Sequence, residues 1–124
     1  QWYERAASLY CGEYLDNLYY DWVLPERQRL REAYLSALRT LASFRAATGD
    51  YEAASALAQR ALQVDSLLED IHCDVMRYYA ALGNRSAVVR QYQRLQKVLK
   101  DELGMQPLAT TQQLYTTLLK EVIT

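Results

Sequence analysis

Two glycines, Gly49 and Gly83, lie 34 residues apart, and the residues around them recur at the same interval. The matched positions carry similar side chains: Leu41 with Val75, Ala46 with Ala80, Ala47 with Ala81, Asp50 with Asn84, Ala53 with Ala87, and Ala61 with Leu95. This repeat constrains the fold more than any other feature of the chain, because each copy must form the same local structure.

A period of about 34 residues is typical of tetratricopeptide-type repeats, in which each unit is a helical hairpin. Apolar residues recur at helical spacing, and no stretch alternates in the way that a half-buried strand does. We therefore predict an all-α fold, a tetratricopeptide-like stack of antiparallel helix hairpins with about six helices. Such stacks offer an extended surface to partners and supply no catalytic loop, so binding is the first functional hypothesis.

The N-terminal part of the chain predicts a short helix followed by a loop. Apolar residues at helical spacing indicate a helix over residues 2–10, which Gly12 ends. Residues 12–21 mix turn formers with tyrosine and leucine, so we expect an apolar loop that folds against the domain and is anchored by Trp22.

The longest helix is predicted over about residues 22–48. Pro25 falls in its opening turn, where proline is tolerated. Gly49 ends this helix, and the Asp50 carboxylate caps the next one. The apolar stripe of the long helix contains Leu30, Tyr34, Leu38 and Leu41.

The second half of the chain carries further helix start signals. Ser66 and Glu69 form an S-x-x-E capping box, in which each side chain is expected to bond the backbone of the same helix start. Asn84 caps the following helix. Thr110 and Gln113 form a second capping box before a terminal helix.

We expect a single domain over residues 1–124. It divides into an N-terminal helix and tyrosine-rich loop (1–24), two helix-hairpin repeats (25–103) and a C-terminal capping helix (104–124). Because two repeats alone would leave apolar faces bare at both ends, the flanking helices must act as caps. The chain begins at Gln1 rather than methionine, and we interpret it as a fragment of a larger protein.

The charge balance argues against nucleic-acid binding by this domain alone. Fourteen basic and fifteen acidic residues give a net charge of -1, which removes the electrostatic drive toward a polyanion. We therefore expect nucleic acid to be a partner only through a domain absent from this chain. No apolar run or signal-peptide pattern predicts a membrane partner, and two widely separated cysteines favour a cytoplasmic location with free thiols.

Three segments together resemble a known family: LYCGEYLDNLYYDWVLPERQRLREAYLSAL near the start, GDYEAASALAQRALQVDS in the middle, and ALGNRSAVVRQYQRLQKVLKDELGMQP toward the end. They look like the bacterial transcriptional activator domain of regulators of the streptomycete antibiotic regulatory protein type. Cys11 and Ser66 depart from the residues common in that family or in such repeats. The most specific matches are Gly12, Glu13, Leu15, Asp21, Trp22, Glu26, Arg27, Leu30, Gly49, Asp50, Tyr51, Ala54, Tyr92, Leu95, Leu103, Gly104 and Pro107.

The resemblance implies a part of a bacterial transcription regulator in which the domain follows a winged-helix DNA-binding domain. The expected partners are proteins: the regulator's own DNA-binding domain, a dimer mate or RNA polymerase. The alternative is a tetratricopeptide adaptor or peptide-binding sensor module that takes no part in transcription.

A partner groove is predicted from equivalent positions of the two repeats. In repeat stacks the face opposite the buried stripe lines a groove, and its residues are Ser36, Arg39, Ser43, Asp70, Cys73 and Arg77. We hypothesise that Arg39 and Arg77 grip an acidic or C-terminal segment of a partner. The alternative is that both arginines are solvated surface charges.

A basic stripe is formed by Arg90, Arg94 and Lys97, at steps of four and three. Three charges on one helix face could contact DNA phosphates beside an attached winged helix. The alternative is an ordinary solvated face, since Asp101 and Glu102 follow directly.

Eleven tyrosines against one phenylalanine suit half-wet protein contacts, because a tyrosine ring carries a polar tip. The N-terminal aromatic residues are candidates for a contact with a preceding domain: Tyr10, Tyr14, Tyr19, Tyr20 and Trp22.

No pattern predicts catalysis. His72, the one histidine, occupies an inward repeat position, and no nucleophile motif or glycine-rich phosphate loop is present. We expect no enzymatic activity, no cofactor and no metal site.

Overall fold

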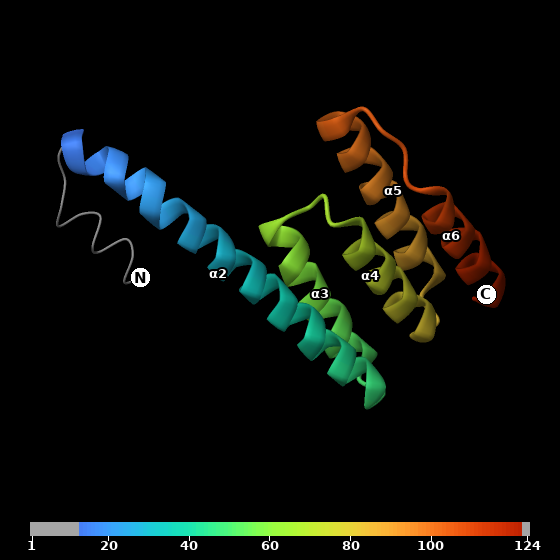
Figure 1. Ribbon diagram of the computed structural model, residues 1–124. Helices are drawn as coiled ribbons and strands as arrows, with labels where there is room; N and C mark the ends of the chain where they lie inside the picture. The colour runs from blue at the N-terminus through green and yellow to red at the C-terminus, as the bar shows by residue number, and fades with distance from the viewer. Residues whose placement is uncertain (1–12, 123–124) are drawn as a thin grey trace. The chain divides into compact units, whose positions relative to one another are not determined.

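The computed structural model describes the backbone of residues 13–122 and the side chains of residues 25–122. Over this range the chain forms five helices, α2 to α6, and no strand (Figure 1). The all-α prediction is therefore confirmed for the described residues, whereas the helix predicted over residues 2–10 lies outside them. The helices are α2 (Glu13–Ala47), α3 (Tyr51–Val64), α4 (Glu69–Ala81), α5 (Arg85–Leu103) and α6 (Ala109–Glu121).

The predicted loop over residues 12–21 is wrong where the structure describes it, because α2 begins at Glu13 and runs without interruption to Ala47. Pro25 consequently lies inside the helix and not in its opening turn. Proline lacks an N–H group, so the carbonyl of Asp21 receives no intrahelical hydrogen bond from residue 25. The fixed φ of proline is nevertheless compatible with a helix. The surrounding residues include strong helix formers, so the helix continues through this position.

The chain divides into two compact units between Ser36 and Ala37. Within the first unit, the described residues 13–36 belong to α2. The second unit contains the last turns of α2 together with α3 to α6. The packing and the polar clusters described below lie in the second unit.

The two glycine turns have the same geometry. Gly49 has φ 86° and Gly83 has φ 74°, a left-handed conformation that favours glycine. In each turn the following polar residue accepts a hydrogen bond from a backbone N–H three residues ahead: Ala53 donates to the Asp50 carboxylate over 3.2 Å, and Ala87 donates to the Asn84 amide oxygen over 3.1 Å. The caps predicted from the 34-residue offset are confirmed.

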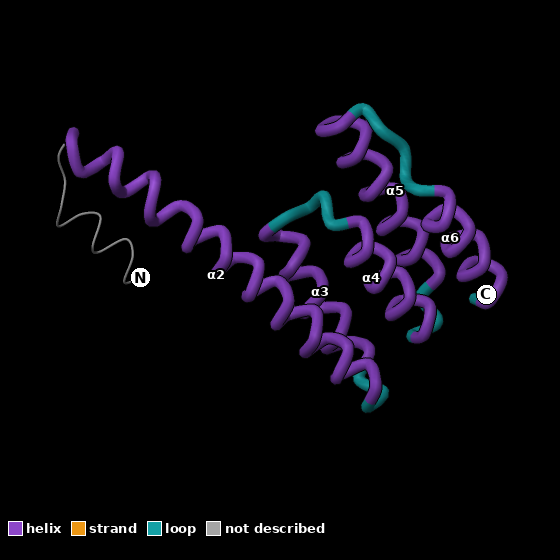
Figure 2. Tube along the Cα trace, viewed as in Figure 1, coloured by secondary structure: helices purple, strands orange, loops and turns teal. Residues whose placement is uncertain are grey.

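Helix α4 lies at the centre of the second unit, with α3 on one side and α5 and α6 on the other (Figure 2). Seven of its thirteen residues are buried, and the side chains of Val75 and Met76 are fully enclosed. Helix α3 packs against α4 and buries the small residues Ala54, Ala58 and Ala61. Small side chains let two helix axes approach closely.

The apolar stripe predicted for α2 is only partly correct. Leu38 is buried together with Ala42, whereas Leu30, Tyr34 and Leu41 are each more than two-fifths exposed. Within the second unit, Leu38 and Ala42 are buried and Leu41 is exposed, so this part of α2 carries both buried and exposed apolar residues.

Both predicted capping boxes are wrong. Helix α4 begins at Glu69 and α6 at Ala109, and no side chain caps either of them. The Glu69 carboxylate instead accepts a hydrogen bond from the backbone N–H of Leu108 over 2.8 Å, which ties the start of α6 to the first turn of α4.

Helix α6 covers the apolar side of α4 and α5. Leu118 joins a buried cluster with Cys73, Met76, Val88 and Tyr92. The rings of Tyr92 and Tyr115 stack in parallel at a centroid distance of 3.9 Å. The terminal helix thus closes this face of the second unit.

Candidate functional site

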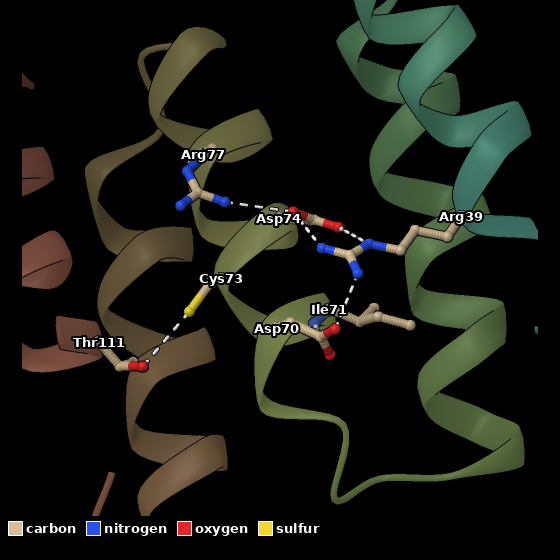
Figure 3. A network of polar contacts seen from close by, with 7 residues as sticks. All are labelled: Arg39, Asp70, Ile71, Cys73, Asp74, Arg77 and Thr111. Carbon is tan, nitrogen blue, oxygen red and sulfur yellow. Dashed lines mark hydrogen bonds and ion pairs between the residues drawn. The ribbon is translucent and has the colours of Figure 1, made fainter. Parts of the chain in front are cut away.

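Helices α2 and α4 bring four charged side chains together, Arg39, Asp70, Asp74 and Arg77 (Figure 3). We call them the arginine–aspartate cluster. Arg39 donates from Nε to Asp74 over 2.8 Å and from Nη1 to Asp70 over 2.8 Å. Arg77 donates to the other oxygen of Asp74 over 3.2 Å.

The cluster follows from helical spacing. Positions 70, 74 and 77 are separated by four and three residues, so they share one face of α4. Asp70 lies in the first turn of α4, where a carboxylate is favoured by the helix dipole. Arg39 lies on α2 within reach of that face, and its long side chain spans the two carboxylates (Figure 3).

The two aspartates have different environments. The Asp74 side chain is 12% exposed and accepts from two guanidinium groups, whereas the Asp70 side chain is 60% exposed. The hydrogen bond that Arg39 donates to the Asp74 carboxylate raises the pKa of Arg39, so this guanidinium stays charged. Because an exposed ion pair contributes about 0–1 kcal/mol, the contact of Arg39 with Asp70 is the weaker part of the cluster.

The structure therefore brings Arg39, Asp70 and Arg77 of the predicted groove together and adds Asp74, which the sequence reasoning missed. Asp74 lies four residues after Asp70 and three before Arg77, and this spacing could have identified it. Ser36 and Ser43 are exposed on α2. Ser43 hydrogen-bonds the hydroxyl of Tyr78, whose pKa is raised chiefly by burial.

The prediction that Cys73 lines the same surface is wrong. Its side chain is 8% exposed and points toward α6, where its Sγ lies 3.6 Å from the Thr111 hydroxyl (Figure 3). Burial raises the pKa of this thiol. A one-residue step rotates a side chain by about 100° around a helix, so Cys73 faces the core while Asp74 faces the cluster.

A second polar network links α3, α4 and α5 in the interior. His72 is 1% exposed and donates from Nε2 to the carbonyl of Ser66 over 2.9 Å. Its Nδ1 must then accept, and it accepts from the Gln91 amide nitrogen over 2.7 Å. The Gln91 oxygen accepts from Gln59 over 2.9 Å, and the Gln59 oxygen accepts from Arg94 over 2.9 Å. We call this run of hydrogen bonds the amide chain.

His72 is therefore a packed histidine with both ring nitrogens bonded. Burial, the largest influence, lowers its pKa, and the nearby Arg94 charge acts in the same direction. The neutral imidazole is the form that the amide chain requires.

The predicted basic stripe lies on α5 as expected from its spacing. Arg90, Arg94 and Lys97 are all exposed. Arg94 is held by Gln59, and Lys97 pairs with Asp101 over 3.0 Å.

The predicted aromatic contact cannot be located from side chains. Tyr10 lies outside the described residues. Tyr14, Tyr19, Tyr20 and Trp22 lie on the backbone of α2, and their side chains are outside the described ones.

Within the part of the chain that the structure describes, histidine, cysteine, aspartate and glutamate form no group of three that could hold a metal ion. Among the same residues, no helix combines the length and the apolar character needed to cross a membrane.

Comparison with known protein families matches residues 1–119 to the bacterial transcriptional activator domain. No curated protein and no solved structure matches the chain. The family match extends over almost all 124 residues and confirms the resemblance found in the sequence. This family is one of regulatory domains and not of enzymes. The chain therefore belongs to the bacterial transcriptional activator domain family.

Proposed function

We propose that this chain is a protein-interaction module of a bacterial DNA-binding transcription regulator, and that it positions a separate winged-helix domain, a dimer mate or RNA polymerase. The observation that carries this proposal is the partly exposed arginine–aspartate cluster in a domain of the transcriptional activator family. Arginine is enriched at the energetically dominant positions of protein interfaces.

A tetratricopeptide-like stack is the architecture that we propose for this module. It is supported by the equivalent turns at Gly49 and Gly83 and by the equivalent caps at Asp50 and Asn84. In such a stack the hairpins around these turns bring the end of α2 close to α4, and the hydrogen bonds of Arg39 to Asp70 and Asp74 support this arrangement.

The cluster can receive a partner carboxylate by exchange. Asp74 holds the Nε edge of Arg39 and is mostly enclosed, so it keeps the guanidinium in place. Asp70 is exposed, and a partner's acidic side chain or C-terminus can replace it at Nη1 with little loss. Arg77 is 54% exposed and offers further N–H donors beside it. The charge of the incoming group therefore replaces that of Asp70.

The test is a reporter assay in bacteria with this chain fused to a monomeric DNA-binding domain whose operator lies beside a weak promoter. We expect the fusion to raise transcription. Arg39→Ala with Arg77→Ala should lower this activation, because loss of a modest interface hot spot reduces the affinity for the partner about tenfold. Asp70→Asn removes the competing carboxylate and should leave activation equal or higher. The matched control is Arg45→Ala with Lys120→Ala, two exposed basic residues outside the cluster.

Two results would contradict different parts of this proposal. A fusion that leaves transcription at the level of the DNA-binding domain alone rejects activation by recruitment, and peptide binding by the purified chain would then favour the adaptor or sensor alternative. Full activation by the Arg39 and Arg77 variant, with an unchanged melting temperature, rejects the cluster as the contact surface.

A further inference from the structure

The charges of this protein are unevenly distributed among its helices. Helices α3 and α5 together contain six basic and three acidic residues, whereas the rest of the chain contains eight basic and twelve acidic ones. Although the net charge of the chain is -1, these two helices together carry a positive net charge.

The positive charge is concentrated on one face of α5. Arg90, Arg94 and Lys97 lie four and three residues apart, opposite the buried residues Leu95 and Leu99. We call these three residues the basic face. At a rise of about 1.5 Å per residue they extend over roughly 10 Å along the helix, enough to meet successive phosphates of a nucleic-acid strand.

One of the three cations is held in position before any partner arrives. Arg94 donates to the Gln59 amide oxygen over 2.9 Å, and the Gln59 nitrogen is itself bonded to Gln91 and to the Tyr79 hydroxyl over 2.9 and 3.1 Å. A guanidinium group has five N–H donors, so the remaining donors can bind a ligand. A side chain already held in place loses less conformational entropy on binding.

The exposed side chains of this face favour phosphate over protein. Beside the three cations they include the amide of Gln93 and the hydroxyl of Ser86, both of which can hydrogen-bond phosphate oxygens. The exposed carboxylate of Asp101 also lies on this face, where it pairs with Lys97 over 3.0 Å. Aromatic and apolar side chains, which form the cores of protein interfaces, are not among the exposed side chains of this face.

We propose that the basic face binds the phosphate backbone of double-stranded DNA without reading its sequence. In a transcriptional activator domain, this contact adds to the affinity supplied by a separate DNA-binding domain. Lys97 is 79% exposed in its pair with Asp101, so a phosphate can compete for it. The contact is weak, because only three cations take part and the chain as a whole has a net charge of -1. It depends strongly on salt, because it is ionic.

The experiment measures binding of the 124-residue chain to a fluorescein-labelled 24-base-pair duplex of arbitrary sequence by anisotropy, between 20 and 200 mM KCl. Three phosphate contacts predict a slope of about -2.7 for the logarithm of the association constant against the logarithm of salt concentration. Each of Arg90→Gln, Arg94→Gln and Lys97→Gln should reduce that slope by about 1. Gln59→Ala, which frees Arg94, should weaken binding while leaving the slope unchanged.

The control is Arg45→Gln with Lys120→Gln, which removes two exposed cations elsewhere and should leave affinity unchanged. Circular dichroism identifies any variant that fails to fold, and the single variants then carry the test. Absence of binding at 20 mM KCl, or equal losses in the control, overturns the proposal. Binding to a poly-glutamate peptide as tight as to the duplex also overturns it and indicates an acidic protein partner. None of these results depends on the arginine–aspartate cluster.

Discussion

Glu69 illustrates how a single side chain can be correctly identified as important and wrongly placed. Its position three residues after Ser66 predicts a local capping box, yet its carboxylate accepts from the backbone N–H of Leu108, 39 residues away. A local pattern contains no information about a loop that returns from another part of the chain. Glu69 therefore stabilises the protein through a tertiary contact and not by capping its own helix.

We expect Glu69→Ala to lower the free energy of unfolding by about 1 kcal/mol, because the N–H of Leu108 loses its acceptor. For a domain of this size the melting temperature should fall by about 4 °C. Thermal unfolding followed by circular dichroism measures the effect. Glu102→Ala, which removes an exposed glutamate on α5, is the control; equal losses in both variants would show that the bond to Leu108 contributes nothing.

His72 predicts a dependence of stability on pH. Burial lowers its pKa in the folded protein below the ordinary value of 6.5, so between these two values the unfolded chain binds more protons than the folded one. The contribution is thus complete above pH 6.5 and is lost as the pH falls toward the folded pKa. The facing charges are Arg94, which lowers this pKa, and Glu69, which opposes it.

Because the chain has one histidine, its imidazole resonance can be titrated by NMR without assignment ambiguity. We expect a midpoint below 6.5, together with urea-unfolding free energies that increase from pH 5 to pH 6.5. A midpoint above 6.5 would contradict the enclosed, neutral histidine.

Helix ends that are set by neighbouring residues in the sequence were predictable, whereas ends that are set by tertiary contacts were not. The turns at Gly49 and Gly83 are local: a left-handed glycine followed by a capping Asp or Asn. The start of α2 was misread because the tyrosine-rich run blurs its helical spacing. The exposed part of its apolar stripe depends on which helices cover it, and one sequence does not contain that information.

At Gly83, alanine should destabilise the protein by about 1 kcal/mol. No atom lies within 4 Å of the position a Cβ would occupy, so the effect comes from the backbone at φ 74° and not from a clash. Asparagine tolerates this conformation better, so Gly83→Asn should cost less. Denaturant unfolding of both variants measures the difference; equal values would show that backbone strain is not the cause.

At the scale of the whole molecule, the candidate site was partly predictable. Equivalent positions of the two repeats identified Arg39 and Arg77, and the structure joins them through Asp74. Cys73 was misplaced because an offset of 34 residues does not specify helix rotation to within one residue. Pairing across α2 and α4, like the amide chain, depends on distances between helices that periodicity does not contain.

The closure of the second unit by α6 can be tested at Leu118, which is 6% exposed in the cluster of Met76, Val88 and Tyr92. Leu118→Ala should destabilise the protein by about 2–4 kcal/mol, through lost burial and the resulting cavity. The control is Leu108→Ala, since Leu108 is 58% exposed. Equal melting temperatures for the two variants would mean that α6 does not seal the core.

The amide chain also has a direction. Each glutamine donates through nitrogen toward one end and accepts through oxygen at the other, and the neutral ring of His72 determines which way round they lie. A proton arriving at Nδ1 would require both amides to reverse, and the nitrogen of Gln59 would then confront Arg94. Protonation of the buried His72 ring would thus release the guanidinium group of Arg94 at the protein surface.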